Sequence, residues 1–138
     1  MTAAQAVDRG RDAVVADLMS RPVLTVEVGE TLWDAWQLLF VSGLRHLVVL
    51  DADGTSLGVL SDRSILAEVP ATADHLSRRL VGDVLAMVPL VSVLPDDPPI
   101  AAARVMVDNT VEALPVLDGA GRLLGIVTES DIVRWLVR

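Results

Sequence analysis

The sequence contains no cysteine and no lysine, and aromatic residues make up only 3% of it. Without cysteine, disulfides and thiolate metal sites are excluded. The two histidines, His46 and His75, lie far apart and lack metal-ligand spacing, so we predict no metal site. No apolar run reaches the roughly 18 residues of a membrane span, and no signal peptide is recognisable at the N-terminus. A cytoplasmic protein is therefore expected.

Positive charge is also scarce, because every basic residue is an arginine and the net charge is −8. No basic stripe is available to neutralise phosphates, which argues against nucleic acid and against anionic membrane surfaces. What is abundant is apolar: 52% of the 138 residues are hydrophobic, mostly Val, Leu, Ile and Ala. Such a small chain has more apolar surface than one core buries, so we expect a homodimer.

The chain repeats itself when Pro22 is placed over Pro89, an offset of 67 residues. Residues 22–66 and 89–133 then align without a gap, and roughly a quarter of the positions are identical. The preceding segments VADLM (15–19) and VGDVL (81–85) also correspond, one residue out of step. We therefore predict an extension at 1–14, copy one at 15–69, a polar connection at 70–80 and copy two at 81–138.

Each copy shows the same order of patterns, β-α-β-β-α. An extended piece (Val23–Val26 or Leu90–Val93) precedes a helical pattern that starts after Thr31 or at Pro98-Pro99. Two apolar runs follow, joined by turns in which Asp51 and Asp118 are expected to bond the local backbone. A last helix is predicted at Ser64–Val69 and at Glu129–Val137. One copy alone buries too little surface to be stable, so we predict an α+β fold whose two sheets pack around a pseudo-twofold axis.

The most specific pattern is the hairpin followed by GIVTESD (125–131), with its twin GVLSDRS (58–64). Together with the repeat, it resembles a tandem pair of cystathionine β-synthase (CBS) domains, or Bateman module, over about residues 15–137. The resemblance implies a regulatory protein, not an enzyme. It also implies an adenosine-containing ligand, such as AMP, ATP or S-adenosylmethionine, bound in clefts between the copies. Output would pass to a protein partner, with many members pairing as homodimers.

The resemblance also implies roles for particular residues. In the family, the carboxylate at the last position of the GIVTESD pattern accepts hydrogen bonds from both hydroxyls of a ribose, which agrees with the acceptor capacity of an aspartate. The implied ribose contacts are Asp131, Thr128 and Ser130. The implied phosphate contacts are Arg45 and His46. The implied adenine or cleft-wall contacts are Asp17, Pro22, Val23, Leu114 and Pro115.

Copy one departs from this pattern, because Ser64 occupies the position of Asp131. We therefore expect one competent site and a degenerate second site around Ser61 and Ser64. Copy two has Glu112 where copy one has Arg45, and its negative charge disfavours a polyphosphate. AMP, adenosine or an S-adenosyl compound is favoured over ATP, and no cofactor is required.

Simpler interpretations stay open for the same residues. Thr128 and Asp131 have the spacing of a capping box that starts a helix. The twin helix starts without the acid, which favours a ligand role for Asp131. Arg45 can be a surface arginine and His46 a half-buried strand residue. Catalysis is not expected, because no His stands with a Ser and an acid. The alternative function is a ligand-free dimerisation and protein-docking module.

Overall fold

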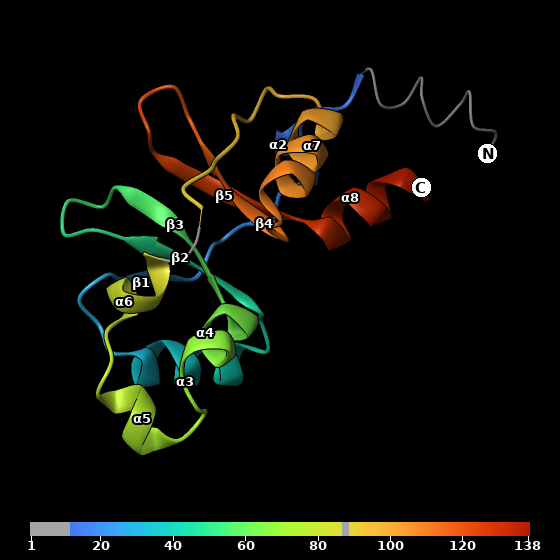
Figure 1. Cartoon of the computed structure of the whole chain (residues 1–138). Coiled ribbons are helices and arrows are strands. Elements are labelled where there is room, and N and C mark those ends of the chain that lie inside the picture. The colour runs from blue at the N-terminus through green and yellow to red at the C-terminus, as the bar shows by residue number, and fades with distance from the viewer. Residues whose placement is uncertain (1–11, 87–88) are drawn as a thin grey trace. The chain divides into compact units, whose positions relative to one another are not determined.

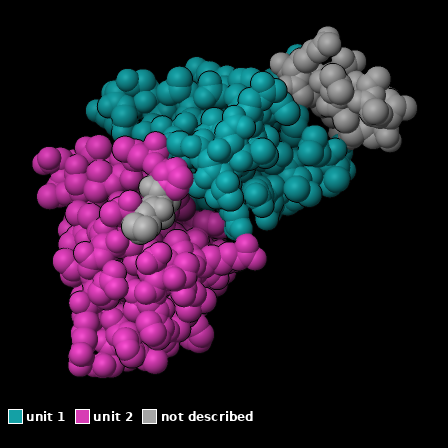
Figure 2. Space-filling view, viewed as in Figure 1, with its two compact units in different colours: residues 1–22, 91–138 teal, residues 23–90 magenta. Residues whose placement is uncertain are grey.

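The computed structural model describes residues 12–86 and 89–138 (Figure 1). The chain divides into two compact units, shown in separate colours in Figure 2. Unit 1 combines the described part of the first 22 residues with Val91–Arg138, and unit 2 is Val23–Leu90. Most of the extension predicted at 1–14 lies outside the described residues.

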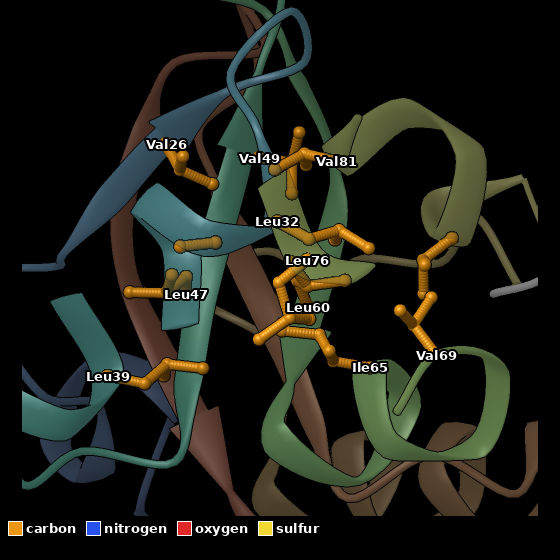
Figure 3. Packing of buried hydrophobic residues seen from close by; sticks show 12 residues of the cluster. Val26, Leu32, Leu39, Leu47, Val49, Leu60, Ile65, Val69, Leu76 and Val81 are labelled. Carbon is orange, nitrogen blue, oxygen red and sulfur yellow. The ribbon is translucent and has the colours of Figure 1, made fainter. Parts of the chain in front are cut away.

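Unit 2 contains a three-stranded sheet of β1 (Thr25–Glu27), β2 (His46–Leu50) and β3 (Ser56–Ser61). Strand β1 is parallel to β2, and β2 is antiparallel to β3. The helices are α3 (Leu32–Ser42), α4 (Asp62–Glu68), α5 (Ala73–Ser77) and α6 (Val81–Leu85). Their apolar side chains meet the sheet in a core of aliphatic residues, where Leu47, Leu60 and Ile65 are fully buried (Figure 3).

Unit 1 contains the antiparallel hairpin of β4 (Ala113–Leu117) and β5 (Leu123–Thr128). Val93 forms a parallel bridge to β4, and Ser20 forms an antiparallel bridge to β5. The helices are α2 (Val15–Leu18), α7 (Pro99–Asn109) and α8 (Glu129–Leu136). The α+β class and the repeated β-α-β-β-α order are thereby confirmed. The first strand of copy two is reduced to the single bridge at Val93.

The segments that precede the two repeats pack in an exchanged manner. Helix α2 precedes copy one in sequence, yet it contacts α7, α8 and β5 of copy two (Figure 1). The backbone amides of Val15 and Ala16 donate to the carbonyls of Asp97 and Pro95, at 2.8 and 2.9 Å. The Val15 side chain is fully buried in the core of unit 1.

Helix α6 shows the reciprocal arrangement, because it precedes copy two but belongs to unit 2. The amides of Val81 and Gly82 donate to the carbonyls of Glu30 and Val28, at 2.9 and 3.1 Å. These acceptors are the repeat equivalents of Asp97 and Pro95. Each copy therefore completes its core with the lead segment of the other copy. We call residues 15–20 and 81–86 the lead segments from here on.

The turn chemistry agrees with the prediction. One carboxylate oxygen of Asp51 accepts from the amides of Asp53 and Thr55, each at 2.9 Å. Asp118 does the same with Ala120 and Arg122, each at 2.9 Å. The two hairpins thus share one local hydrogen-bond pattern, which is why both could be recognised from the repeat.

The polar connection predicted at 70–80 contains helix α5 (Ala73–Ser77). Thr72 starts it by accepting from the amide of His75 at 3.2 Å. Leu76 is fully buried in the core of unit 2, next to α3. The sequence does not reveal this helix, since a single apolar residue in a polar stretch gives no periodic signal.

Candidate functional site

The candidate site is the junction at which β5 ends and α8 begins. Thr128 is the N-cap, and its hydroxyl accepts from the amide of Asp131 at 3.3 Å. In return, Oδ2 of Asp131 accepts from the amide of Thr128 at 2.9 Å and from its hydroxyl at 3.1 Å. The two side chains form a reciprocal capping box, so the simpler interpretation of this motif is confirmed as part of its role.

The twin junction in copy one makes the same cap without an acid. The hydroxyl of Ser61 accepts from the amide of Ser64 at 3.0 Å, and Oγ of Ser64 accepts from the amide of Ser61 at 2.8 Å. Serine therefore satisfies the same backbone donors at the start of α4 as aspartate does at the start of α8. The carboxylate of Asp131 is more than the cap requires.

Burial of the Asp131 carboxylate carries a desolvation cost in free energy. The Asp131 residue is only 6% exposed, although it lies at the start of a surface helix. A buried charge is tolerated when it is paired and hydrogen-bonded. The partner is Arg134, whose Nη2 donates to Oδ1 of Asp131 at 2.7 Å. The guanidinium side chain is itself 63% exposed, so the pair joins a buried anion to a solvent-facing cation.

Several of the other predicted ligand residues lie in unit 1. Pro115 pairs in register with Ile126 of β5 and is buried, and Leu114 is fully buried in the core. Asp17 is exposed and accepts from the amide of Val14 at 3.0 Å, which caps α2. Ser130 and Pro22 are exposed. The Leu114 side chain thus serves the core, while the roles predicted for the others stay predictions.

The remaining predicted residues lie in unit 2. Arg45 is an exposed residue whose Nε is 3.6 Å from Oδ2 of Asp62. His46 is half-buried at the start of β2 and pairs in register with Ser61. Val23 is half-buried at the first position of the unit. Arg45 and His46 are therefore not in the unit that holds Asp131, and their predicted phosphate role stays a prediction.

Within residues 12–86 and 89–138, no group of three or more His, Cys, Asp or Glu side chains lies close enough to hold a metal ion. Over the same described ranges, no helix has the length and apolarity to cross a bilayer.

Comparison with known families decides the identity of the repeat. A family model for the CBS domain matches residues 15–71 and 81–138. The chain belongs to the CBS domain family. The two copies found by internal alignment are therefore two CBS domains in tandem, and the predicted resemblance is confirmed.

Relatives of this CBS pair differ in length. A CBS domain-containing protein of Dictyostelium discoideum is 31% identical over 91% of this chain and 92% of its own length. A homoserine O-acetyltransferase of Methanococcoides burtonii is 33% identical over 88% of this chain, but the match spans only 24% of that protein. The chain thus covers about a quarter of this larger relative. Among solved structures, CBSX2 in complex with AMP is 28% identical over 90% of this chain and 96% of its own, with a TM-score of 0.74.

The sequence predictions did not include Arg134 in the site. Two signals in the sequence point to it. It stands three residues after Asp131, and residues at this spacing are neighbours on one helix face. Its repeat equivalent is Ala67, in the copy that has Ser64 in place of Asp131. The acid and the arginine are present together in copy two and absent together from copy one.

Proposed function

We propose that this CBS pair is a regulatory protein that binds an adenosine-containing ligand through Asp131 and passes the signal to a protein partner. The observation that carries the proposal is the comparison of the two helix starts. Ser61 and Ser64 complete the cap in copy one without an acid, so the equivalent cap in copy two does not need the buried charge of Asp131. A ribose provides two adjacent hydroxyl donors, and an ionised carboxylate is an acceptor for both.

The ligand class follows from the charges next to this junction. The amide of Glu129 donates to the carbonyl of Glu112 at 2.9 Å, so two acidic residues flank the start of α8. Their negative charge opposes a polyphosphate, which favours AMP, adenosine or S-adenosylmethionine over ATP. The relative CBSX2, solved with AMP, supports a ligand of this class. A cytoplasmic location stays a prediction.

The test is Asp131→Ser, which copies the residue of the twin junction. The variant should keep the cap and change the free energy of unfolding by less than about 1 kcal/mol. It should weaken the ligand by about tenfold or more, because hydrogen bonds to a charged group contribute about 1.5–3 kcal/mol. Calorimetric titration with AMP, adenosine, ATP and S-adenosylmethionine gives the affinities, and urea unfolding gives the stability.

The matched control is Ser64→Ala in copy one. It removes the equivalent cap, at a cost of about 1 kcal/mol of stability, and should leave ligand affinity unchanged. The sensor proposal fails when none of the four compounds binds the unaltered chain. Assignment of the site to Asp131 fails when Asp131→Ser binds as tightly as the unaltered chain.

A second candidate function is a ligand-free dimerisation and docking module. It is favoured by exposed apolar side chains at equivalent positions of the two copies. Phe40 on α3 corresponds to Val107 on α7, and these residues are 83% and 77% exposed. Leu66 on α4 corresponds to Val133 on α8, at 51% and 57%. Apolar residues exposed at matching positions are typical of surfaces that are buried in an assembly.

We therefore expect a homodimer that buries these helix faces. The double variant Phe40→Asp with Val107→Asp should turn the dimer into a monomer in sedimentation experiments. An acid buried in an apolar interface without a partner is strongly unfavourable. The control is Leu90→Asp, which makes the same kind of apolar-to-acidic substitution at a residue that is 73% exposed and lies outside these helices. A monomeric unaltered chain, or a double variant that still dimerises, contradicts the expectation.

A further inference from the structure

Arg134 donates a hydrogen bond to the carboxylate oxygen of Asp131 that is not used by the helix cap. The cap uses Oδ2, which accepts from the amide and the hydroxyl of Thr128. Arg134 uses Oδ1, at 2.7 Å. A carboxylate offers about four acceptor positions, two on each oxygen. One position on Oδ1 is therefore still available beside the guanidinium.

A ribose needs more than this single position. Its two adjacent hydroxyls each donate one hydrogen bond, and bidentate binding to Asp131 requires both positions of Oδ1. The guanidinium of Arg134 must then give up its hydrogen bond to this oxygen. Arg134 can do so without unfolding the helix, because its side chain is 63% exposed and its backbone lies in the last turn of α8.

The cost of this exchange depends on the charge of the ligand. An uncharged nucleoside replaces the ion pair with two neutral donors, and the arginine is left without its buried partner. A nucleoside monophosphate carries an anion on the 5′ carbon of the same ribose, and arginine pairs well with phosphate oxygens. A sulfonium ligand such as S-adenosylmethionine brings a second cation to the guanidinium instead.

Arg134 lies in the last turn of α8, where a cation also suits the helix dipole, but the comparison with copy one links it to the acid. In copy one the cap is complete with Ser64, and Ala67 occupies the equivalent of Arg134. The arginine accompanies the acid only where the acid is present.

We propose that Arg134 is a specificity-determining residue of the Asp131 site. It leaves Oδ1 when a ribose binds and pairs with the phosphate of the ligand, so the site selects adenosine monophosphates over uncharged and cationic adenosyl compounds. This inference rests on the proposed function. It assigns the phosphate contact to a cation whose contact to Asp131 is seen directly.

The competing explanation is that Arg134 only neutralises the buried Asp131. In that case its loss lowers stability and changes the affinities of AMP and adenosine by the same factor. Selectivity, measured as the ratio of the two dissociation constants, separates the explanations because a purely structural role does not move it.

The experiment measures dissociation constants of AMP and adenosine by calorimetric titration for the full chain, Arg134→Gln and Arg134→Lys. The unaltered chain should bind AMP about tenfold or more tightly than adenosine, the order expected for one charge-assisted contact. Arg134→Gln should bind AMP more weakly and adenosine more tightly, which brings the ratio close to one. Arg134→Lys should keep part of the preference. The matched control, Arg104→Gln, alters an exposed arginine on α7 of the same unit and should leave the ratio unchanged.

The outcomes distinguish this inference from the proposed function. A ratio that is the same in Arg134→Gln and in the unaltered chain overturns the selectivity role and leaves the Asp131 site standing. A chain that binds neither compound, with or without Arg134, overturns both. If Arg134→Gln binds adenosine and the unaltered chain does not, the inference is supported, because the arginine then blocks the carboxylate.

Discussion

Val15→Asp is expected to unfold the hairpin of copy two, which lies about a hundred residues further along the chain. Val15 is fully buried in unit 1, in one cluster with Leu114, Val116 and Val127. An unpaired carboxylate placed there should cost on the order of 4 kcal/mol or more. Urea unfolding measures the loss. Hydrogen exchange locates it, and protection should fall in β4 and β5 more than in β2 and β3.

The matched control changes the neighbouring valine to the same acid. Val14 is half-buried and is the N-cap of α2, a position where aspartate is among the favoured residues. Val14→Asp should therefore leave stability unchanged or slightly raised. The exchanged packing of the lead segment would be refuted if Val15→Asp lowered protection chiefly in β2 and β3.

Gly125→Val is expected to detach the same lead segment from β5. A Cβ atom at Gly125 would lie 2.7 Å from Sδ of Met19 and 3.0 Å from the carbonyl oxygen of Ser20. The Ser20 backbone is hydrogen-bonded to Ile126 in both directions, at 2.8 and 3.2 Å, so it cannot retreat without breaking these bonds. Overpacking and lost hydrogen bonds together should cost about 3 kcal/mol. Urea unfolding of the full chain measures it.

Two comparisons test the cause. Gly119→Val adds the same side chain where nothing lies within 4 Å of the new Cβ, and it should be nearly neutral. Combining Gly125→Ala with Met19→Ala should cost less than the two single changes added together, because the shorter side chain relieves the clash. If the two losses of stability are strictly additive, then Met19 is not the side chain that requires a glycine at position 125.

The features that could be predicted from the sequence were those with a local cause. The hairpin turns follow from Asp51 and Asp118, which bond the backbone two and four residues ahead. The helix starts follow from Thr31, Ser61 and Thr128, which each accept from the amide three residues ahead. The repeat then fixed the order of elements, because the same local signals recur at the same offset.

The site could be predicted only in part, for a physical reason. Spacing shows that Thr128 and Asp131 can share a helix start, and the structure confirms it. Spacing does not show that the carboxylate is 6% exposed, nor that Arg134 neutralises it at 2.7 Å. Burial depends on segments far away in sequence that cover the junction. The same limit explains why the sequence does not reveal helix α5, whose one buried residue is Leu76, within the predicted connection.

The sequence by itself determined that this chain has two equivalent β-α-β-β-α copies, and that the third residue of the last helix is a carboxylate in copy two but a serine in copy one. It could not determine which copy each lead segment completes. VADLM and VGDVL have nearly the same apolar pattern, and each suits either copy equally well by chemistry. Only tertiary contacts decide the matter, with Val15 bonded to Asp97 and Val81 bonded to Glu30. The hydrophobic effect is non-directional. An apolar pattern therefore shows that a helix face must be buried, but only the tertiary structure shows which segment buries it.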